Sequence, residues 1–351
     1  MRVLVDTTYA RRGHTGTSTY LARLLPALRA LGVDVREAAN EARLPPAGGG
    51  AGSLRNAAAD RWWTAVELPR RARAERVDVL HHPLPARSAA APCAQAITLH
   101  DLAFERLPEA FDPRFRAFAR RVHRHAARRA DAVVCVSQTT AVDAAALWGV
   151  RRARIVVARH GPGQEPDVLA AAATGAGGHF LYVGDAEPRK NVGLLLAAYA
   201  DYRRAEGPAA LPLVLAGSGD ARNGNGEQPG VRHEHVPGES RLAELLAGAA
   251  ALVHPSLHEG FGLTPLEAMS AGTPVLAARS PGVVEICADA AAWFDPRDAG
   301  SLAAGLSRLA GDDAVRRDLA ERGRRRAAEF SWARAARAHV DAYTVAVENT
   351  R

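Results

Sequence analysis

Short apolar runs rich in β-branched residues alternate along the whole chain with alanine- and leucine-rich segments. This alternation is typical of α/β folds, in which helices cover sheets of parallel strands. The pattern predicts strands at 2–6, 33–37, 77–81, 96–100, 132–136 and 154–158, and at 179–184, 213–216, 233–236, 251–254 and 274–277. Each half of the chain therefore predicts a doubly wound, Rossmann-like domain of its own.

The length of 351 residues suits two domains better than one core. Residues 161–178 are rich in Gly, Ala and Pro, as linkers are, and residues 45–53 are typical of a surface loop. We expect an N-terminal domain at 1–162 and a C-terminal domain at 163–332. A last helix, at about 333–351, is expected to pack back onto the first domain. Two such domains would face a central cleft, a common place for ligands.

Composition and cysteine usage indicate a cytoplasmic protein. The three cysteines, Cys93, Cys135 and Cys287, are odd in number and form neither a disulfide framework nor a metal-ligand spacing. The first residues predict a strand that meets Asp6, which is unlike a signal peptide. No apolar run approaches the roughly 20 residues that span a bilayer.

The segment 254–275, HPSLHEGFGLTPLEAMSAGTPV, carries two carboxylates around a glycine-rich turn. Glycines allow a ligand to approach the backbone closely, and a helix N-terminus favours phosphate. Glu259 and Glu267 could accept hydrogen bonds from a sugar on one side and a ribose on the other. Glu267 has a structural alternative, because Thr264-x-x-Glu267 with Pro265 has the form of a capping box. The structural alternative for Glu259 is a solvated loop carboxylate.

The single lysine of the chain marks a second candidate. Of the 45 basic residues, 44 are arginine and one is Lys190. Drift toward arginine codons in a GC-rich genome explains most of this bias, but not the one lysine that remains. Arg189 and Lys190 stand just before Asn191, the expected N-cap of a leucine-rich helix. Two adjacent cations at a positive helix end gain from a diphosphate between them; two solvated loop cations are the alternative.

Two weaker candidates lie in the first half. The segment Arg12–Ser18 reads RGHTGTS and is expected to form a loop after the first strand, with a helix beginning near Thr19. Such a loop suits a phosphate or an acceptor, although one glycine-rich loop is a weak signal. His100 and Asp101 follow a predicted strand, where a histidine can act as a donor or an acid/base group.

Together these motifs resemble the retaining, nucleotide-sugar glycosyltransferases of the GT-B fold, sequence family 4, over nearly the full length. The strongest match is the E-x7-E signature, Glu259 to Glu267 in HEGFGLTPLE. Supporting matches are RKN at 189–191, HDL at 100–102, VSQTT at 136–140, AGSG at 216–219 and FSW at 330–332. Many members have Gly-Arg where this chain has Gly184-Asp185, so it is most similar to the subgroup with an EPRKN turn.

The resemblance implies a role for each matched position. Glu259 would contact the donor sugar and face the developing positive charge, and Glu267 would accept from the ribose hydroxyls. Arg189 and Lys190 would stabilise the leaving diphosphate, and His100 would hydrogen-bond the transferred sugar. Backbone amides would hold sugar and phosphate, and the N-terminal domain would close over the phosphates. The residues implied for these last two tasks are Gly260, Phe261, Gly262 and Leu263, and Gly16 and Thr17.

The expected activity is metal-independent transfer of a hexosyl group to an acceptor hydroxyl on a glycan, a lipid-linked glycan or a small molecule. The chain has no Asp-x-Asp pair, and two cations could replace a divalent ion. No cofactor and no nucleic-acid partner are expected. Another nucleotide-sugar activity, such as epimerisation or hydrolysis, and a catalytically idle binding protein stay as alternatives. A nicotinamide-dependent dehydrogenase is disfavoured because no Gly-x-Gly-x-x-Gly follows the first strand.

The segment 114–129 is dense in arginine and has Phe111, Phe115, Phe118 and Val122 at helical spacing. We favour a helix with one packed apolar face and one solvated face. The alternative is a basic amphipathic surface that contacts anionic lipid at the inner face of a membrane, which would suit a lipid-linked acceptor.

Overall fold

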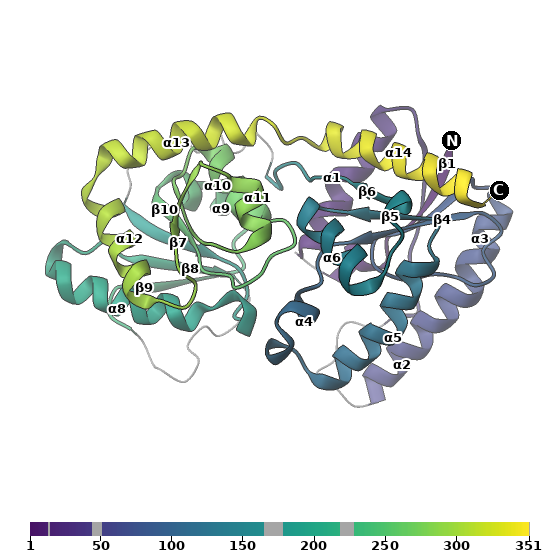
Figure 1. Ribbon diagram of the computed structural model, residues 1–351, viewed down its shortest axis with the longest axis horizontal. Coiled ribbons are helices and arrows are strands. Elements are labelled where there is room, and N and C mark those ends of the chain that lie inside the picture. The colour runs from purple at the N-terminus through teal and green to yellow at the C-terminus, as the bar shows by residue number, and fades with distance from the viewer. Residues whose placement is uncertain (13–14, 44–50, 165–177, 218–227, 351) are drawn as a thin grey trace. The chain divides into compact units, whose positions relative to one another are not determined.

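The computed structural model describes residues 1–12, 15–43, 51–164, 178–217 and 228–350. The chain divides into two compact units: unit 1 comprises Met1–Gly161 and Ser331–Arg351, and unit 2 comprises Pro162–Phe330. The chain therefore leaves unit 1 after residue 161 and returns to it at residue 331 (Figure 1). Most of the expected linker at 161–178 and of the expected loop at 45–53 lies outside the described residues. The end of that loop is corrected, because residues from Ala51 onward are helical.

Unit 1 is built on a parallel six-stranded sheet in the order β2-β1-β3-β4-β5-β6. This confirms the predicted βα architecture, and each predicted strand of this half is present within two residues at either end. The strands are β1 (Arg2–Asp6), β2 (Asp34–Ala38), β3 (Val79–His82), β4 (Ala94–Leu99), β5 (Ala132–Cys135) and β6 (Ile155–Val157). The helices are α1 (Gly16–Ala30), α2 (Ala51–Trp62), α3 (Leu68–Ala74), α4 (Ala103–Arg106), α5 (Pro113–Arg129), α6 (Gln138–Trp148) and α14 (Trp332–Thr350).

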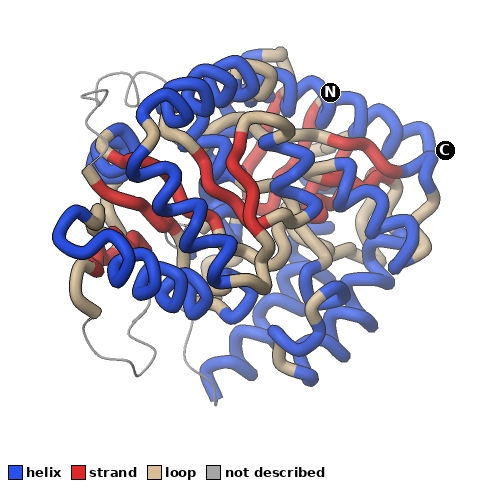
Figure 2. Tube along the Cα trace, turned by 60° about the vertical axis from the view of Figure 1, so that its left-hand side comes forward, coloured by secondary structure: helices blue, strands red, loops and turns tan. Residues whose placement is uncertain are grey.

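Alternate residues of these strands supply two apolar layers, one on each face of the sheet. On one face Val134 packs with residues of α1 and α14, among them Leu24 and Tyr343. On the other face Val133 and Cys135 pack with α5 and α6, where Trp148 is the largest side chain. Figure 2 shows the strands running between helices.

Unit 2 repeats the plan with a parallel six-stranded sheet in the order β12-β11-β10-β7-β8-β9. Counted from β7, this is the Rossmann order 3-2-1-4-5-6 read from the other edge. The strands are β7 (His179–Val183), β8 (Leu213–Gly217), β9 (Val231–His235), β10 (Ala249–His254), β11 (Val275–Ala278) and β12 (Ala291–Phe294). The helices are α8 (Val192–Glu206), α9 (Glu239–Ala247), α10 (Leu263–Ala271), α11 (Pro281–Cys287), α12 (Ala299–Gly311) and α13 (Asp313–Ala327). Sequence analysis missed β12, a four-residue edge strand.

A chain of polar contacts ties α14 to the core of unit 1. Tyr343 Oη lies 2.9 Å from His81 Nδ1, and His81 Nε2 lies 2.9 Å from Thr98 Oγ1. Thr98 Oγ1 lies 3.0 Å from Tyr20 Oη, which lies 2.7 Å from His339 Nε2. All five side chains are buried. The expected return of the last helix to the N-terminal domain therefore has a specific polar anchor as well as an apolar one.

Candidate functional site

The site in unit 2 lies where the strand order reverses, between β7 and β10. In open parallel sheets, ligands bind outside the carboxyl ends of the strands at such a point. After β7 the chain makes a short 3-10 turn, Pro188–Lys190, before α8 begins. After β10 it makes the loop 255–262 before α10 begins. Leu257 N donates to the Arg189 carbonyl oxygen at 2.9 Å, so the two loops are joined through their backbones.

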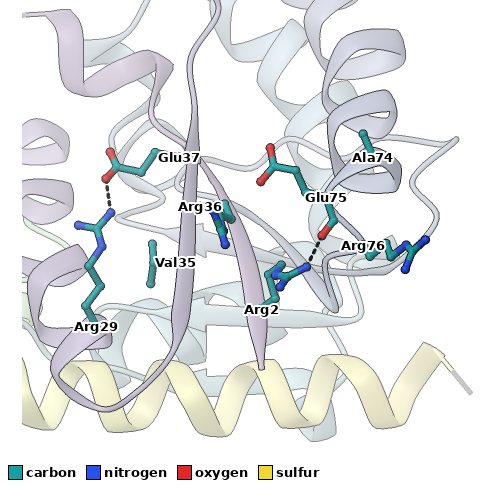
Figure 3. A pocket seen from close by; sticks show the side chains of 8 residues that line it. All are labelled: Arg2, Arg29, Val35, Arg36, Glu37, Ala74, Glu75 and Arg76. Carbon is teal, nitrogen blue, oxygen red and sulfur yellow. Dashed lines mark hydrogen bonds and ion pairs between the residues drawn. The ribbon is translucent and has the colours of Figure 1, made fainter.

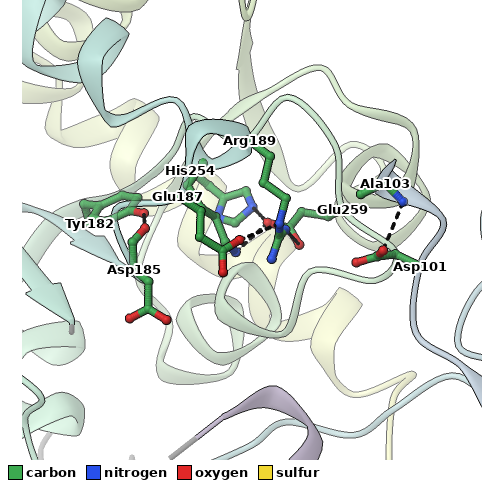
Figure 4. Close-up of polar contacts among 9 residues, drawn as sticks. Asp101, Ala103, Tyr182, Asp185, Glu187, Arg189, His254 and Glu259 are labelled. Atoms are coloured by element: carbon green, nitrogen blue, oxygen red, sulfur yellow. Dashed lines mark hydrogen bonds and ion pairs between the residues drawn. The ribbon is translucent and has the colours of Figure 1, made fainter. Parts of the chain in front are cut away.

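Glu259 lies between the two cations of the first loop. Lys190 Nζ is 2.7 Å from Glu259 Oε1, and Arg189 Nη1 is 3.3 Å from Glu259 Oε2. Arg189 Nε also contacts Glu187 Oε2 at 2.8 Å (Figure 4). The side chains of Arg189, Lys190 and Glu259 are only 18%, 16% and 11% exposed, whereas that of Glu187 is 49% exposed. The structure thus brings three of the candidate residues into one nearly buried ion cluster.

The electrostatics of this cluster keep Glu259 ionised. Burial alone would raise the pKa of its carboxyl group, but Lys190, His254 and Arg189 together hold that pKa well below its ordinary value. A carboxylate with this environment stays negative across the neutral range. It is therefore able to face a positive charge that develops on a bound sugar.

His254 is a residue of this site that sequence analysis missed. In the structure His254 ends β10, is 2% exposed, and places Nε2 3.5 Å from Glu259 Oε1, a close polar contact that does not meet hydrogen-bond geometry. Burial lowers the pKa of His254, so the ring is neutral. Its place at the carboxyl end of a strand was the signal that could have found it.

Asn191 fixes the turn that carries Arg189 and Lys190, but not through the helix cap that we expected. It precedes α8 as predicted, but its side chain does not cap the helix. Its backbone is left-handed, with φ 58°, a conformation that Asn tolerates better than most residues. Its Nδ2 donates to the Pro296 carbonyl oxygen at 2.9 Å. The turn that carries Arg189 and Lys190 is therefore fixed to the loop after β12.

The structural alternative for Glu267, a capping box with Thr264, is contradicted by the structure. Gly262 occupies the N-cap of α10 with φ 103°, and no side chain makes a capping hydrogen bond there. Because glycine adopts this conformation without strain, the helix begins at Leu263, before the predicted start. Glu267 therefore lies in the second turn, where it is 8% exposed. Gly272 ends the helix in a left-handed conformation, with φ 76°.

Gly282 has the closest backbone contact of the site. A Cβ atom there would lie 2.0 Å from the Glu259 carbonyl oxygen and 3.2 Å from the Gly260 carbonyl carbon. Only glycine allows α11 to begin against this loop. The backbone from Glu259 to Gly262 is buried on this side, and the Phe261 ring packs edge-on against Phe330 at 6.0 Å between centroids.

The remaining candidates belong to unit 1. The expected loop at Gly16 and Thr17 is corrected: both residues lie in the first turn of α1. The helix begins early because Thr15 caps it, and Thr15 and Ser18 exchange hydrogen bonds as a capping box. Gly16 is exposed, and a Cβ atom there would meet nothing within 4 Å.

His100 follows β4, as predicted, and its ring packs edge-on against Tyr20. Its Nε2 lies 3.0 Å from the Pro83 carbonyl oxygen, which can only accept, so Nε2 carries the proton. Burial lowers the pKa of His100, and the neutral ring keeps Nδ1 as an acceptor. The next residue, Asp101, accepts from Ala103 N at 3.0 Å (Figure 4).

A separate hollow in unit 1 has several arginines but no surplus of charge. It is lined by Arg2, Arg29, Val35, Arg36, Glu37, Ala74, Glu75 and Arg76 (Figure 3). Arg2 and Arg36 both pair with Asp34, and Arg29 pairs with Glu37. These partners neutralise most of the arginines, so the hollow offers little to an anion. Among the described residues, no group of three or more His, Cys, Asp or Glu side chains could hold a metal ion.

Two doubly wound parallel sheets, with an ion cluster at the switch point of the second, have the architecture of the GT-B class of glycosyltransferase folds. Solved structures agree. Sucrose-phosphate synthase from Thermosynechococcus elongatus matches with a TM-score of 0.74 and 20% identity, covering 98% of both chains. Anabaena HepE, solved with UDP and glucose, matches with a TM-score of 0.68 and 18% identity, covering 97% of this chain and 98% of its own.

Two family models match the chain, one in each unit. The model for glycosyl transferases group 1 matches residues 175–326, and the model for glycosyltransferase family 4 matches residues 14–161. Both models describe glycosyltransferases, and each matches a little under half of the chain. The chain is 35% identical over 175 residues to O-antigen chain mannosyltransferase B of Escherichia coli, or 47% of this chain and 45% of that protein. It is 42% identical over 113 residues to an MMP α-(1→4)-mannosyltransferase of Mycolicibacterium hassiacum, or 31% of this chain and 28% of that protein. The chain thus spans less than half the length of both curated relatives.

Proposed function

We propose that this chain is a retaining, metal-independent glycosyltransferase that moves a hexosyl group from a nucleoside-diphosphate sugar to an acceptor hydroxyl. The observation that carries the proposal is the ion cluster of Glu259, Arg189 and Lys190 at the switch point of unit 2. The names of the relatives support hexosyl transfer, and the UDP bound by HepE supports a nucleotide donor.

The diphosphate would bind to Arg189 and Lys190. Arg189 offers a planar pair of donors and Lys190 a compact point charge, and the two are complementary toward phosphate oxygens. Glu187, the second partner of Arg189, is half exposed, so an incoming phosphate can replace it at little cost. As the glycosidic bond breaks, negative charge grows on the leaving diphosphate. The two cations stabilise that charge in the way a divalent ion would.

The sugar would lie against Glu259 and the backbone of residues 260–263. A glycosyl group that leaves a diphosphate acquires oxocarbenium-like positive charge. The ionised Glu259 stabilises this charge, and the amides of this loop orient the sugar and the near phosphate. Glu267, one turn into α10, would accept hydrogen bonds from the ribose hydroxyls. His100 Nδ1 would accept a hydrogen bond from a sugar hydroxyl, and Gly16 and Thr17 would donate backbone amides at the start of α1.

The test is a binding and product assay on the full chain. Guanosine, uridine and thymidine diphosphates and their hexose conjugates are added in turn, and the unfolding temperature is followed with and without EDTA. One nucleotide family should raise that temperature, equally in both conditions. With that donor and a panel of acceptors, NMR should show a glycoside with the donor's anomeric configuration. Stabilisation that EDTA abolishes, or an inverted product, would refute the metal-independent or the retaining part.

The same assay separates the alternatives. An epimerase would return an altered nucleotide sugar, and a hydrolase would release free sugar whether or not an acceptor is present. A catalytically idle protein would bind the donor and form no product.

We expect His254 to position Glu259. Replacing His254 by Phe fills the same space but removes the neutral ring nitrogen beside Glu259 Oε1. A contact of this kind contributes at most about 1 kcal/mol, so kcat should fall by up to roughly fivefold while the Kd for the nucleoside diphosphate changes little. His254→Asn should recover part of the rate. An unchanged kcat in His254→Phe would show that Lys190 and Arg189 hold Glu259 alone.

A further inference from the structure

Helix α5 packs onto unit 1 through alanines rather than through the large apolar side chains that we favoured from the sequence, although the Phe115 ring contacts Phe104 and Phe111. Its buried residues are three alanines, Ala119, Ala126 and Ala127. Phe115, Phe118 and Val122 are instead 42%, 54% and 43% exposed. They are spaced i, i+3 and i+7, so they form a stripe along one side of the helix. Large apolar side chains gathered on one exposed helix require a partner to explain them.

The charged residues of α5 itself have one sign. Residues 113–129 include seven arginines and no acidic residue. Arg120 pairs with Glu105 of α4, and Arg124 Nε approaches the Trp148 carbonyl oxygen. Arg114, Arg121, Arg128 and Arg129 are exposed. Pro113, Arg116, Ala117, Arg120 and Arg121 line a shallow hollow on the same helix.

Helix α13 of unit 2 provides an internal comparison. It has six arginines, but Asp313, Asp318 and Glu321 are interleaved with them. Arg316 pairs with Asp313, Arg322 with Asp318, and Arg325 with Glu321. Half of its arginines are therefore paired with acidic residues of the same helix, whereas α5 has no acidic residue of its own. The unbalanced charge of α5 is a property of that surface and does not follow from the general preference of the chain for arginine.

We propose that α5, residues 113–129, is an interfacial surface that docks unit 1 onto an anionic lipid bilayer. The apolar stripe would enter the boundary between headgroups and acyl chains, and the arginines would contact lipid phosphates. None of the described helices combines the length and the hydropathy needed to cross a bilayer, so the contact would be peripheral. If the proposed transferase uses an acceptor carried on a lipid, this surface would bring the enzyme to it.

Two other partners fit α5 less well. A nucleic acid would use the arginines but has no need of exposed Phe118 and Val122 beside them. A second copy of the chain would cover the apolar stripe, but a symmetric contact would place seven arginines against seven. An anionic bilayer satisfies the charge and the apolar stripe together.

The experiment is co-sedimentation of the full chain with phosphatidylcholine vesicles, with and without phosphatidylglycerol. We expect binding only when phosphatidylglycerol is present. Phe118→Ser/Val122→Ser and Arg121→Gln/Arg128→Gln should each weaken binding about tenfold or more. The matched controls, Leu31→Ser for an exposed apolar residue and Arg317→Gln/Arg325→Gln for the charges of α13, should bind as the wild type does. Unfolding temperatures of all variants are measured in parallel, and a variant that loses stability is replaced by Val122→Ser or Arg128→Gln alone.

Three results would overturn the proposal. The first is equal binding to neutral and anionic vesicles, or none to either. The second is tight binding to a DNA duplex that depends on Arg121 and Arg128 but not on Phe118 and Val122. The third is a dimer in sedimentation velocity that Phe118→Ser/Val122→Ser converts to a monomer. Donor binding by unit 2 is measured separately, so failure here leaves the proposed transfer activity standing, and failure of that activity leaves this surface standing.

Discussion

Replacing Lys190 by alanine is expected to lower the rate of transfer at saturating donor by about 10²–10³-fold. Lys190 Nζ contacts Glu259 at 2.7 Å from a side chain that is only 16% exposed, so no solvent cation takes its place. Its loss removes stabilisation of the leaving diphosphate and leaves Glu259 with Arg189 as its remaining cation partner. Lys190→Arg should be intermediate, because a planar guanidinium cannot repeat the geometry of a compact ammonium. The measurement is kcat for transfer together with the Kd for the nucleoside diphosphate.

Glu259→Gln should distinguish the role of the carboxylate from the role of the two cations, Arg189 and Lys190. It should also abolish most transfer, because the carboxylate that faces the sugar is gone. The affinity for the nucleoside diphosphate should stay the same or rise, since an anion that competes for Arg189 and Lys190 has been removed. Lys190→Ala should instead weaken that affinity. Arg204, which pairs with Asp201 on the exposed side of α8, serves as the matched cation control: Arg204→Ala should leave both quantities unchanged. A wild-type rate of transfer in Lys190→Ala would refute the proposal that Lys190 stabilises the leaving diphosphate.

The fold could be predicted from sequence because a strand buried on both faces is nearly all apolar. This is the case for β4 and β10, which were found within two residues of their observed ends. The edge strands carried weaker signals. β9 is largely exposed and polar, and β12, which is four residues long, was missed. A short edge strand has one neighbour and needs no long apolar run, so pattern alone does not detect it.

Site residues could be predicted where residue type and motif identify them, but not where the conformation of the backbone determines which groups meet. Lys190, Arg189 and Glu259 stood out by residue type and motif, and the structure places them in contact. The role of Glu267 as a cap failed because Gly262 enters a left-handed conformation, which spacing cannot show. His254 was missed because its partner, Glu259, is reached through the curvature of a loop rather than along a helix. The exposure of Phe118 could not be predicted either, because apolar residues at helical spacing are expected both on a buried helix face and on one that contacts a membrane.

The second large effect is expected in the stability of unit 1 toward acid. The polar chain that anchors α14 has only one arrangement of protons if all groups are neutral. His339 Nδ1 lies 2.7 Å from the Ala335 carbonyl oxygen and must donate to it, so His339 Nε2 accepts from Tyr20. Tyr20 then accepts from Thr98, Thr98 accepts from His81 Nε2, and His81 Nδ1 accepts from Tyr343. In this arrangement each of the five side chains makes its hydrogen bonds while all of them are neutral.

Protonation of either histidine breaks this arrangement inside the core. Burial lowers the pKa of His339 to about 4 and holds that of His81 well below its ordinary value. In the unfolded chain both histidines take up a proton near pH 6.5. The folded state therefore binds fewer protons below that pH, so its stability is complete above pH 6.5 and is lost as the pH falls toward 4. His339 alone accounts for a loss of about 3 kcal/mol across this window.

Urea unfolding followed by tryptophan fluorescence measures this loss, since four of the five tryptophans, Trp62, Trp63, Trp148 and Trp332, belong to unit 1. The midpoint for the wild type should fall steadily from pH 6.5 downward. His339→Leu should be less stable at neutral pH, because the Tyr20 hydroxyl loses its acceptor, at a cost of about 1–3 kcal/mol. It should also depend less on pH. Tyr20→Phe combined with His339→Leu removes both partners and should recover part of the neutral stability. If His339→Leu kept the pH dependence of the wild type, the acid sensitivity would have to arise from the other buried histidines, among which burial also holds the pKa of His160 well below its ordinary value.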